Sequence, residues 1–177
     1  MIRTDALRNP DAYPHSVSQI EIIETHISIV VLTGNFVYKI KKPLNLGFLD
    51  FSTLAQRKFF CEEEIRLNQR YASEIYLDTV PITGTADTPL FGGPGPALEY
   101  AVKMRQFPQD QLLDRMLEHD KLDAHYIDEL VAELAAFHLR IRTTNDTIPF
   151  ELQKSIYEPT LANFHAILSI IDDSVGS

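Results

Sequence analysis

Three short segments rich in β-branched and aromatic residues follow one another early in the chain, and their order constrains the fold more than any other feature. Residues 20–24 and 27–32 are separated by Thr25-His26, and residues 36–41 follow the sequence Thr33-Gly34-Asn35. Gly and Asn tolerate the positive φ angles that tight hairpin turns require. The sequence therefore predicts three consecutive antiparallel strands.

A long helix is expected next, over residues 53–71, where Thr53 begins a capping-box pattern. Glu63 lies four residues before Leu67 and three or four residues after two phenylalanines, so it shares their face of the helix. A carboxylate on a face that packs against a sheet is costly unless a cation meets it. Lys39, in the third predicted strand, is the expected partner of Glu63.

Two further strands are predicted over residues 75–82 and 98–105. The Gly- and Pro-rich segment between them, residues 83–96, lacks the Lys-Ser/Thr of a phosphate-binding loop, so we interpret it as a hairpin loop. After Pro108 only helices are expected, over residues 109–117 and 123–142 and from Pro159 onward.

The predicted fold class is therefore α+β: a five-stranded antiparallel sheet with one inserted helix, followed by helices. Three regions are expected. Residues 1–18 are polar and interrupted by proline, which predicts a lead-in that packs loosely or not at all. Residues 19–107 form the sheet lobe, and residues 108–177 begin a helical lobe.

Composition narrows the possible partners and the compartment. The formal net charge of −9 and the scattered Lys and Arg residues argue against nucleic acid as a partner. A lone cysteine, Cys61, fits a reducing compartment, and its position among apolar residues predicts a buried side chain rather than a nucleophile. Neither a signal peptide nor an apolar run of about 20 residues is present, so we expect a cytoplasmic protein with no membrane contact.

Several collinear segments resemble the aminoglycoside phosphotransferase-like family of the kinase superfamily, and in particular a bacterial group in which this domain is fused to a P-loop kinase-type ATPase domain. The segments that carry the resemblance are Glu24-Thr25-His26-Ile27-Ser28, Val37-Tyr38-Lys39-Ile40-Lys41-Lys42-Pro43, Leu46-Gly47-Phe48-Leu49-Asp50-Phe51-Ser52-Thr53-Leu54, Phe60-Cys61-Glu62-Glu63-Glu64-Ile65-Arg66-Leu67-Asn68, Glu99-Tyr100-Ala101-Val102-Lys103-Met104 and Leu134-Ala135-Ala136-Phe137-His138. The resemblance extends from about Tyr13 to about Arg142.

The resemblance implies a protein-kinase-like fold and a bound nucleotide. Lys39 is then expected to contact the α- and β-phosphates of ATP, and Glu63 to orient it, because Glu63 has the family's spacing from Arg-Leu-Asn. Val37 is expected to lie against the adenine. The hinge that offers backbone groups to the adenine edge is expected at Met104, Arg105 and Phe107.

The catalytic loop of the family, of the type His-Gly-Asp-x-His-x-x-x-x-Asn, does not occur in these 177 residues, so no catalytic residue and no metal ligand is assigned. The resemblance implies that the ligands of Mg²⁺ lie beyond Ser177. We therefore expect the N-terminal part of an ATP-dependent phosphotransferase acting on an unknown small-molecule hydroxyl, inactive alone and completed by the rest of the helical lobe. The alternative is a non-catalytic nucleotide-binding or regulatory interaction lobe.

Overall fold

The computed structural model describes residues 2–140, 157–161 and 163–164 of the 177-residue chain. The chain divides into two compact units, Met1–Phe107 and Pro108–Ser177. This division coincides with the change in the sequence, at Pro108, from predicted strands to predicted helices. Each unit is described by itself below.

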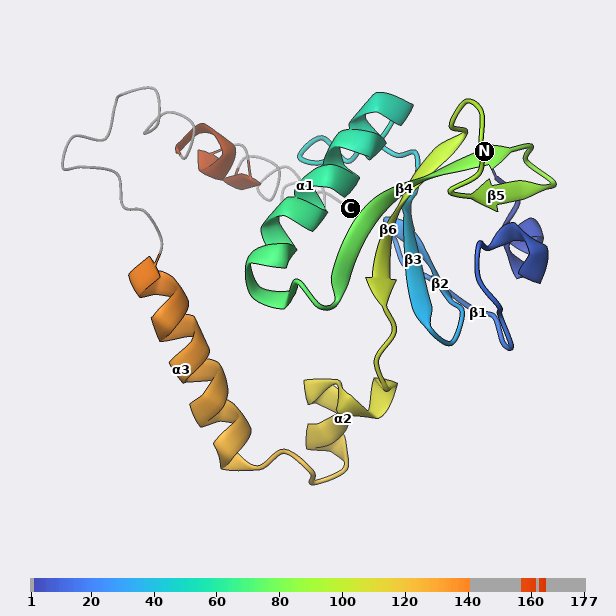
Figure 1. The fold of residues 1–177 in the computed structure, drawn as a ribbon. Helices are drawn as coiled ribbons and strands as arrows, with labels where there is room; N and C mark the ends of the chain where they lie inside the picture. Colours follow the sequence, from blue (N-terminus) through green and yellow to red (C-terminus); the bar gives the residue numbers. More distant parts are fainter. Residues whose placement is uncertain (1, 141–156, 162, 165–177) are drawn as a thin grey trace, which may run out of the picture. The chain divides into compact units, whose positions relative to one another are not determined.

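An antiparallel sheet of six strands forms the first unit, and α1 is inserted between its third and fourth strands (Figure 1). Neighbouring strands follow the order β1-β2-β3-β6-β4-β5. The bounds are Glu21–Glu24 (β1), Ser28–Leu32 (β2), Phe36–Lys41 (β3), Leu54–Ala72 (α1), Tyr76–Gly84 (β4), Pro89–Phe91 (β5) and Glu99–Arg105 (β6). The predicted α+β class and the antiparallel sheet are confirmed.

The prediction of five strands is wrong, because the Gly- and Pro-rich segment contains β5. This short strand pairs with the end of β4, where Ile82 is opposite Phe91. Gly84 has a φ of +84°, and a Cβ there would collide with the backbone carbonyl of Thr88, so only glycine fits this turn. Three residues are too few to show an alternation of apolar and polar side chains, so the sequence pattern does not indicate β5.

The N-terminal residues pack against the sheet, which corrects the expectation of a loose lead-in. Two 3₁₀ turns, Thr4–Arg8 and Pro10–Ala12, bring Leu7 and Tyr13 into the core, where Leu7 is fully buried. The Tyr13 hydroxyl donates a 2.6 Å hydrogen bond to the Leu7 carbonyl, and its ring stacks on Phe91. The prolines argue against an α-helix in this segment. Short 3₁₀ turns do not produce a periodic pattern of apolar residues from which the packing could be predicted.

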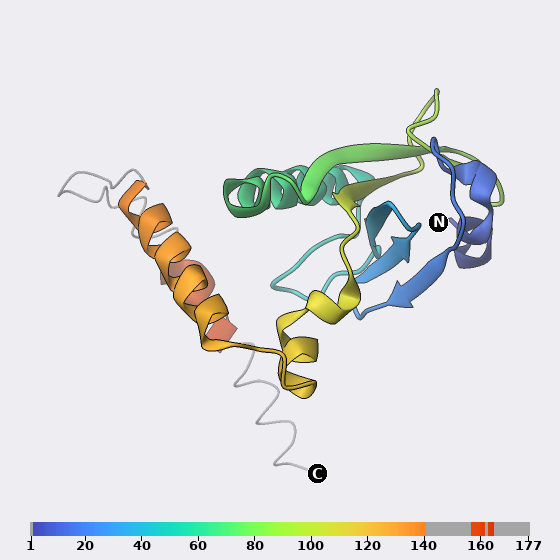
Figure 2. The same ribbon diagram turned by 60° about the horizontal axis from the view of Figure 1, so that its bottom comes forward.

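The core of the first unit lies on one face of the sheet. Tyr38 and Ile40 of β3 point into it, whereas Lys39 and Lys41 point to the opposite face, so the predicted alternation along this strand is correct. The N-terminal turns and α1 lie apart from one another in both views (Figures 1 and 2). The buried apolar cluster consists of Ile2, Leu7, Ala12, Tyr13, Val31, Tyr38, Ile40, Ile82, Phe91 and Ala101.

The second unit is helical where the structure describes it. The helix expected over residues 109–117 is a 3₁₀ turn, Gln109–Gln111, followed by α2, Leu113–Glu118. The longer predicted helix is α3, Ala124–Arg140, and its expected continuation to residue 142 lies outside the described residues. Residues 157–161 and 163–164 are helical, and the rest of the helix expected from Pro159 onward lies outside the described residues.

None of the described helices is both long enough and apolar enough to cross a membrane.

Candidate functional site

Two lysines and one glutamate meet between β3 and α1. Lys39 and Lys41 are two residues apart on β3, so both project from the face that α1 covers. The ammonium group of Lys39 lies 2.8 Å from Oε1 of Glu64, and that of Lys41 lies 2.6 Å from Oε2. Each carboxylate oxygen therefore has its own lysine. We call these three residues the lysine–glutamate cluster.

The expected ion pair between Lys39 and Glu63 is not formed. Glu63 instead accepts two hydrogen bonds from Arg66, at 2.8 and 2.7 Å, on the outer side of the helix. The face argument failed because the apolar stripe that Glu63 shares does not pack against the sheet. Two residues of that stripe, Phe59 and Leu67, are 55% and 44% exposed, and the third, Phe60, packs against Phe51. A strand lysine does meet a helix carboxylate, but the carboxylate is Glu64.

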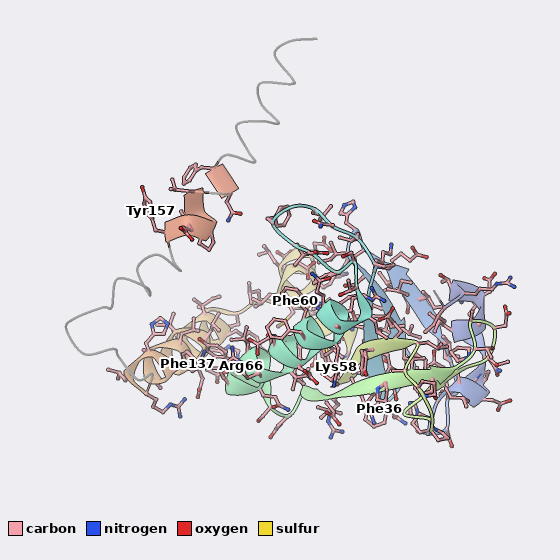
Figure 3. The ribbon with its side chains drawn as sticks, turned by 90° about the horizontal axis from the view of Figure 1, so that it is seen from above. Phe36, Lys58, Phe60, Arg66, Phe137 and Tyr157 are labelled. Atoms are coloured by element: carbon pink, nitrogen blue, oxygen red, sulfur yellow. The ribbon has the colours of Figure 1, made fainter. Side chains whose placement is uncertain are left out.

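The face of α1 that packs against the sheet carries charged side chains. It holds Arg57, Cys61 and Glu64, which contact β6 and β3 and whose spacings of four and three residues place them on one side of a helix. The Asn68 amide donates a 2.8 Å hydrogen bond to the backbone carbonyl of Glu64. This row of helically spaced residues is the sequence signal that would have identified Glu64. Figure 3 shows Arg66 projecting from α1, together with Lys58 and Phe60.

Arg57 attaches the first turns of α1 to the sheet. Its Nε lies 2.8 and 2.9 Å from the two carboxylate oxygens of Glu99, the first residue of β6. Its Nη1 donates to the backbone carbonyls of Phe51 and Ser52, at 2.8 and 3.0 Å. The side chains of Arg57 and Glu99 are only 9% and 6% exposed, so each compensates a charge that would otherwise be buried alone.

The three charged side chains of the lysine–glutamate cluster differ in exposure. Lys41 is 6% exposed, Glu64 is 14% and Lys39 is 30%, so Lys39 is the member that a ligand in solvent would reach first. Burial opposes ionisation of Glu64, but the hydrogen bonds and positive charges of the two lysines outweigh it and keep its pKa below the usual value. Glu64 is therefore a carboxylate at neutral pH.

Two further titratable groups adjoin the cluster, and both are neutral at pH 7. Burial raises the pKa of Cys61 to about 12, and the charges of Glu64 and Glu99 add to this effect against those of the lysines. Cys61 is fully buried, as the sequence predicted, and its thiol faces the Tyr100 carbonyl at 3.9 Å. Burial and the charge of Glu64 likewise raise the pKa of Tyr76.

The structure brings together some of the other predicted nucleotide contacts. Val37 lies opposite Met104 in the β3–β6 pairing, and Met104 lies opposite Tyr76, so these side chains share the face that carries Lys39. Arg105 pairs with Phe36 and therefore projects to the opposite face. The predicted alternation that puts Val37 and Lys39 on one face is present, and Met104 lies on the same face, whereas the side chain of Arg105 lies on the other.

The expected hinge overlaps the end of β6, since the strand extends to Arg105 as predicted. The backbone N–H of Arg105 donates to the Ile75 carbonyl at 2.8 Å, and that of Gln106 donates to the Asn35 carbonyl at 3.0 Å. These two donors are already used within the protein. Phe107 follows as the last residue of the first unit and is partly buried.

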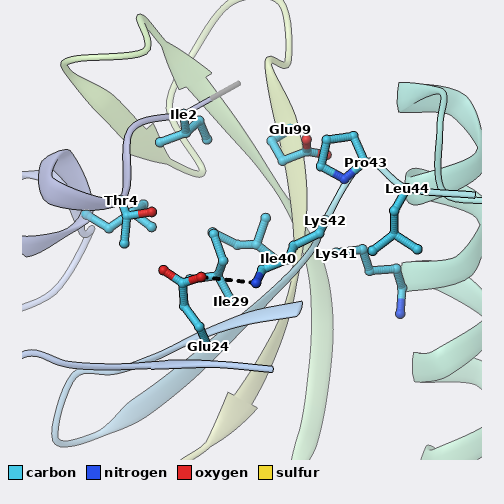
Figure 4. A pocket seen from close by; sticks show the side chains of 11 residues that line it. Ile2, Thr4, Glu24, Ile29, Ile40, Lys41, Lys42, Pro43, Leu44 and Glu99 are labelled. Atoms are coloured by element: carbon cyan, nitrogen blue, oxygen red, sulfur yellow. Dashed lines mark hydrogen bonds and ion pairs between the residues drawn. The ribbon is translucent and has the colours of Figure 1, made fainter. Parts of the chain in front are cut away.

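A separate pocket of about 390 Å³ lies near the N-terminal turns and the end of β3 (Figure 4). Ile2, Ile29 and Ile40 contribute apolar walls, and an ion pair of 3.0 Å joins Lys42 to Glu24 at its side. Lys41 lines this pocket, but Lys39, Glu64 and Val37 do not. The pocket is therefore distinct from the predicted nucleotide contacts.

Comparison with known proteins finds relatives in mycobacteria. A stretch of 131 residues, 73% of this chain, is 33% identical to the uncharacterized protein Rv2004c of Mycobacterium tuberculosis. The uncharacterized protein Mb2027c of Mycobacterium bovis matches with the same identity over the same share of the chain. The chain spans about a quarter (25%) of the length of these curated relatives. No family model matches the chain, and no solved structure matches it.

Proposed function

We propose that the first unit is the nucleotide-binding lobe of a kinase-like, ATP-dependent phosphotransferase whose acceptor is the hydroxyl group of a small molecule. The observation that carries this proposal is the contact of 2.8 Å between the Lys39 ammonium and the Glu64 carboxylate. Kinase-like folds use a strand lysine, oriented by a helix glutamate, to hold the phosphates of ATP. In this proposal Lys39 is the phosphate contact and Glu64 takes the orienting role first expected of Glu63.

The arrangement around this contact supports the proposal. Helix α1 is inserted between β3 and β4, so the glutamate reaches the lysine across the sheet face. Val37 and Met104 lie on that face beside Lys39, where an adenine ring would find apolar side chains. The Lys39 side chain is 30% exposed, the most of the three charged side chains in the cluster.

The remaining catalytic parts are assigned to the longer protein. Phosphoryl transfer needs Mg²⁺ and a residue that positions the acceptor hydroxyl, and both are expected in the helical lobe beyond Ser177. The relatives, of which this chain spans 25%, are long enough to contain such a lobe and a further P-loop kinase-type ATPase domain. We place the complete protein in the cytoplasm.

Nucleotide affinity of the full-length protein tests the proposal. Lys39→Met should raise the Kd for Mg-ATP at least about tenfold, because it removes a charge-assisted contact to phosphate. Calorimetric titration measures this change. Glu63→Gln is the matched control, since Glu63 neighbours Glu64 but bonds only to Arg66 among the interactions of the described residues, and it should leave the Kd unchanged.

An unchanged Kd in Lys39→Met would remove the assignment of this site. Phosphoryl transfer provides the second measurement, with the full-length protein, radiolabelled ATP and a panel of small hydroxyl compounds. Transfer that disappears in Lys39→Met supports the phosphotransferase. Binding of Mg-ATP with neither phosphoryl transfer nor hydrolysis of ATP to ADP would instead favour the non-catalytic, regulatory lobe.

A further inference from the structure

We infer that Lys41 is a positioning residue that holds Glu64, and with it α1, on the sheet while Lys39 turns to a phosphate. This inference rests on the proposed function. A single lysine–glutamate pair is sufficient for the kinase-like device. Here a second lysine contacts the same carboxylate, at 2.6 Å, and the proposed function alone gives it no role.

The geometry divides the work between the two lysines. Lys39 contacts Oε1 of Glu64 and Lys41 contacts Oε2, so departure of one lysine leaves the other contact intact. The Lys41 side chain is 6% exposed against 30% for Lys39. Separating a buried ammonium group from its carboxylate costs more free energy than separating a more exposed ammonium group. Lys41 is thus the fixed contact and Lys39 the exchangeable one.

Lys41 is itself held in place from a second side. Its ammonium group lies 5.0 Å from the centre of the Phe51 ring, within the range of a cation–π contact. Phe51 is 3% exposed, and its carbonyl accepts the 2.8 Å hydrogen bond from Arg57. The two ion pairs that join α1 to the sheet, at Arg57 and at Glu64, therefore meet through Phe51.

The charges of the cluster agree with this division. Two lysines face one carboxylate, which leaves one positive charge in excess. Arg57 and Glu99 compensate each other, and Cys61 and Tyr76 are neutral, so none of these described neighbours removes this excess. With Lys41 in place, Lys39 can neutralise a phosphate without leaving Glu64 as a buried, uncompensated charge. Helix α1 is then attached to the sheet both with and without nucleotide.

Hydrogen exchange of the full chain without nucleotide tests the attachment. Lys41→Met should accelerate exchange of the amides between Glu64 and Ala72 at least about tenfold, because α1 loses its fixed contact. Lys39→Met should have a much smaller effect on the same amides, and Glu63→Gln none. Equal acceleration in the two lysine variants, or a larger one in Lys39→Met, would overturn the inference.

Nucleotide affinity of the full-length protein tests how Lys41 acts. Lys41→Met should raise the Kd for Mg-ATP about tenfold, because Lys39 becomes the sole counterion of Glu64, and Lys41→Arg should restore most of the affinity. In a Glu64→Gln background the same Lys41→Met change should alter the Kd less than about twofold. An undiminished effect in that background would mean that Lys41 does not act through Glu64.

The two proposals fail in different ways. If the wild-type protein does not bind Mg-ATP, the proposed function is wrong, while the exchange experiment still decides whether Lys41 is the fixed contact of Glu64. If Mg-ATP binds and depends on Lys39 but exchange is insensitive to Lys41→Met, the site stands and the role of Lys41 is wrong.

Discussion

The two faces of the sheet in the first unit are held by different kinds of interaction. On one face, Tyr38 of β3 packs among apolar and aromatic side chains of the N-terminal turns and β5, with ring centres 5.4 Å from Tyr13 and 4.6 Å from Phe91. On the other, Lys39 and Lys41 of the same strand meet a carboxylate of α1. Alternate residues of one strand therefore serve two packing modes.

The two faces stabilise the unit in different ways. Apolar packing is non-directional and tolerates small displacements, so it suits the face that only has to exclude water. Buried charges demand defined partners and distances, and they remain costly where a partner is lost. On the ionic face the charged groups are therefore held at defined positions. A phosphate site needs positive charge at a defined position.

The largest effect is expected where the ionic face is broken completely. Arg57→Met leaves the Glu99 carboxylate, 6% exposed, without its counterion and removes two hydrogen bonds to backbone carbonyls. The free energy of unfolding should fall by about 3–5 kcal/mol. Urea denaturation, followed by circular dichroism, measures the change.

A double variant distinguishes lost attraction from uncompensated charge. Arg57→Met combined with Glu99→Leu removes both ions, and it should recover much of the lost stability because no unpaired charge stays buried. Arg66→Met, on the exposed side of the same helix, is the control and should change little. A double variant that is no more stable than Arg57→Met would show that the backbone hydrogen bonds of Arg57 dominate.

A smaller effect, dependent on pH, is expected at Glu64. At neutral pH, Glu64→Gln should lower the free energy of unfolding by about 2 kcal/mol, because Lys41 loses its counterion. The pKa of Glu64 is lowered in the folded protein, so its contribution is complete above the ordinary glutamate pKa and is lost as the pH falls through the lowered value.

The difference between wild type and Glu64→Gln should therefore narrow once the pH falls below about 4.3. Denaturation curves at a series of pH values test this, with Glu63→Gln as the neighbouring control. A difference that stays constant down to the acid limit would mean that ionised Glu64 does not stabilise the fold.

The smallest effect is expected on the apolar face. The Tyr38 hydroxyl is buried and has no hydrogen-bond partner among the described residues, so Tyr38→Phe should leave stability unchanged or raise it by up to about 1 kcal/mol. Tyr13→Phe should lower stability by about 1 kcal/mol, since the Tyr13 hydroxyl donates to the Leu7 carbonyl. Thermal unfolding compares the two variants. A clear loss in Tyr38→Phe would reveal a partner for its hydroxyl.

Between Glu63 and Glu64, the sequence alone predicted the wrong partner for Lys39. The helix itself and its capping box at Thr53 were predicted, and the structure has both. The choice between adjacent carboxylates depended on which face of α1 packs, and the rule that apolar residues pack gave the wrong face. Phe59 and Leu67 are exposed, while Arg57 and Glu64 face the sheet. Pairing with charges on β3 and β6 reversed the usual preference.

The sequence by itself determined the local elements: the first three strands with their turn at Gly34, the long capped helix and the alternation that separates Lys39 from Tyr38. These follow from side-chain periodicity and turn chemistry within a few residues. Tertiary structure alone decided three further features: the burial of the N-terminal turns, the pairing of β5 and the use of Glu64 for both lysines. The first and the third depend on partners far away in the chain, because the energy of a buried group is set by what meets it in space. The second is a local pairing with β4, but a strand of three residues is too short to show an apolar alternation.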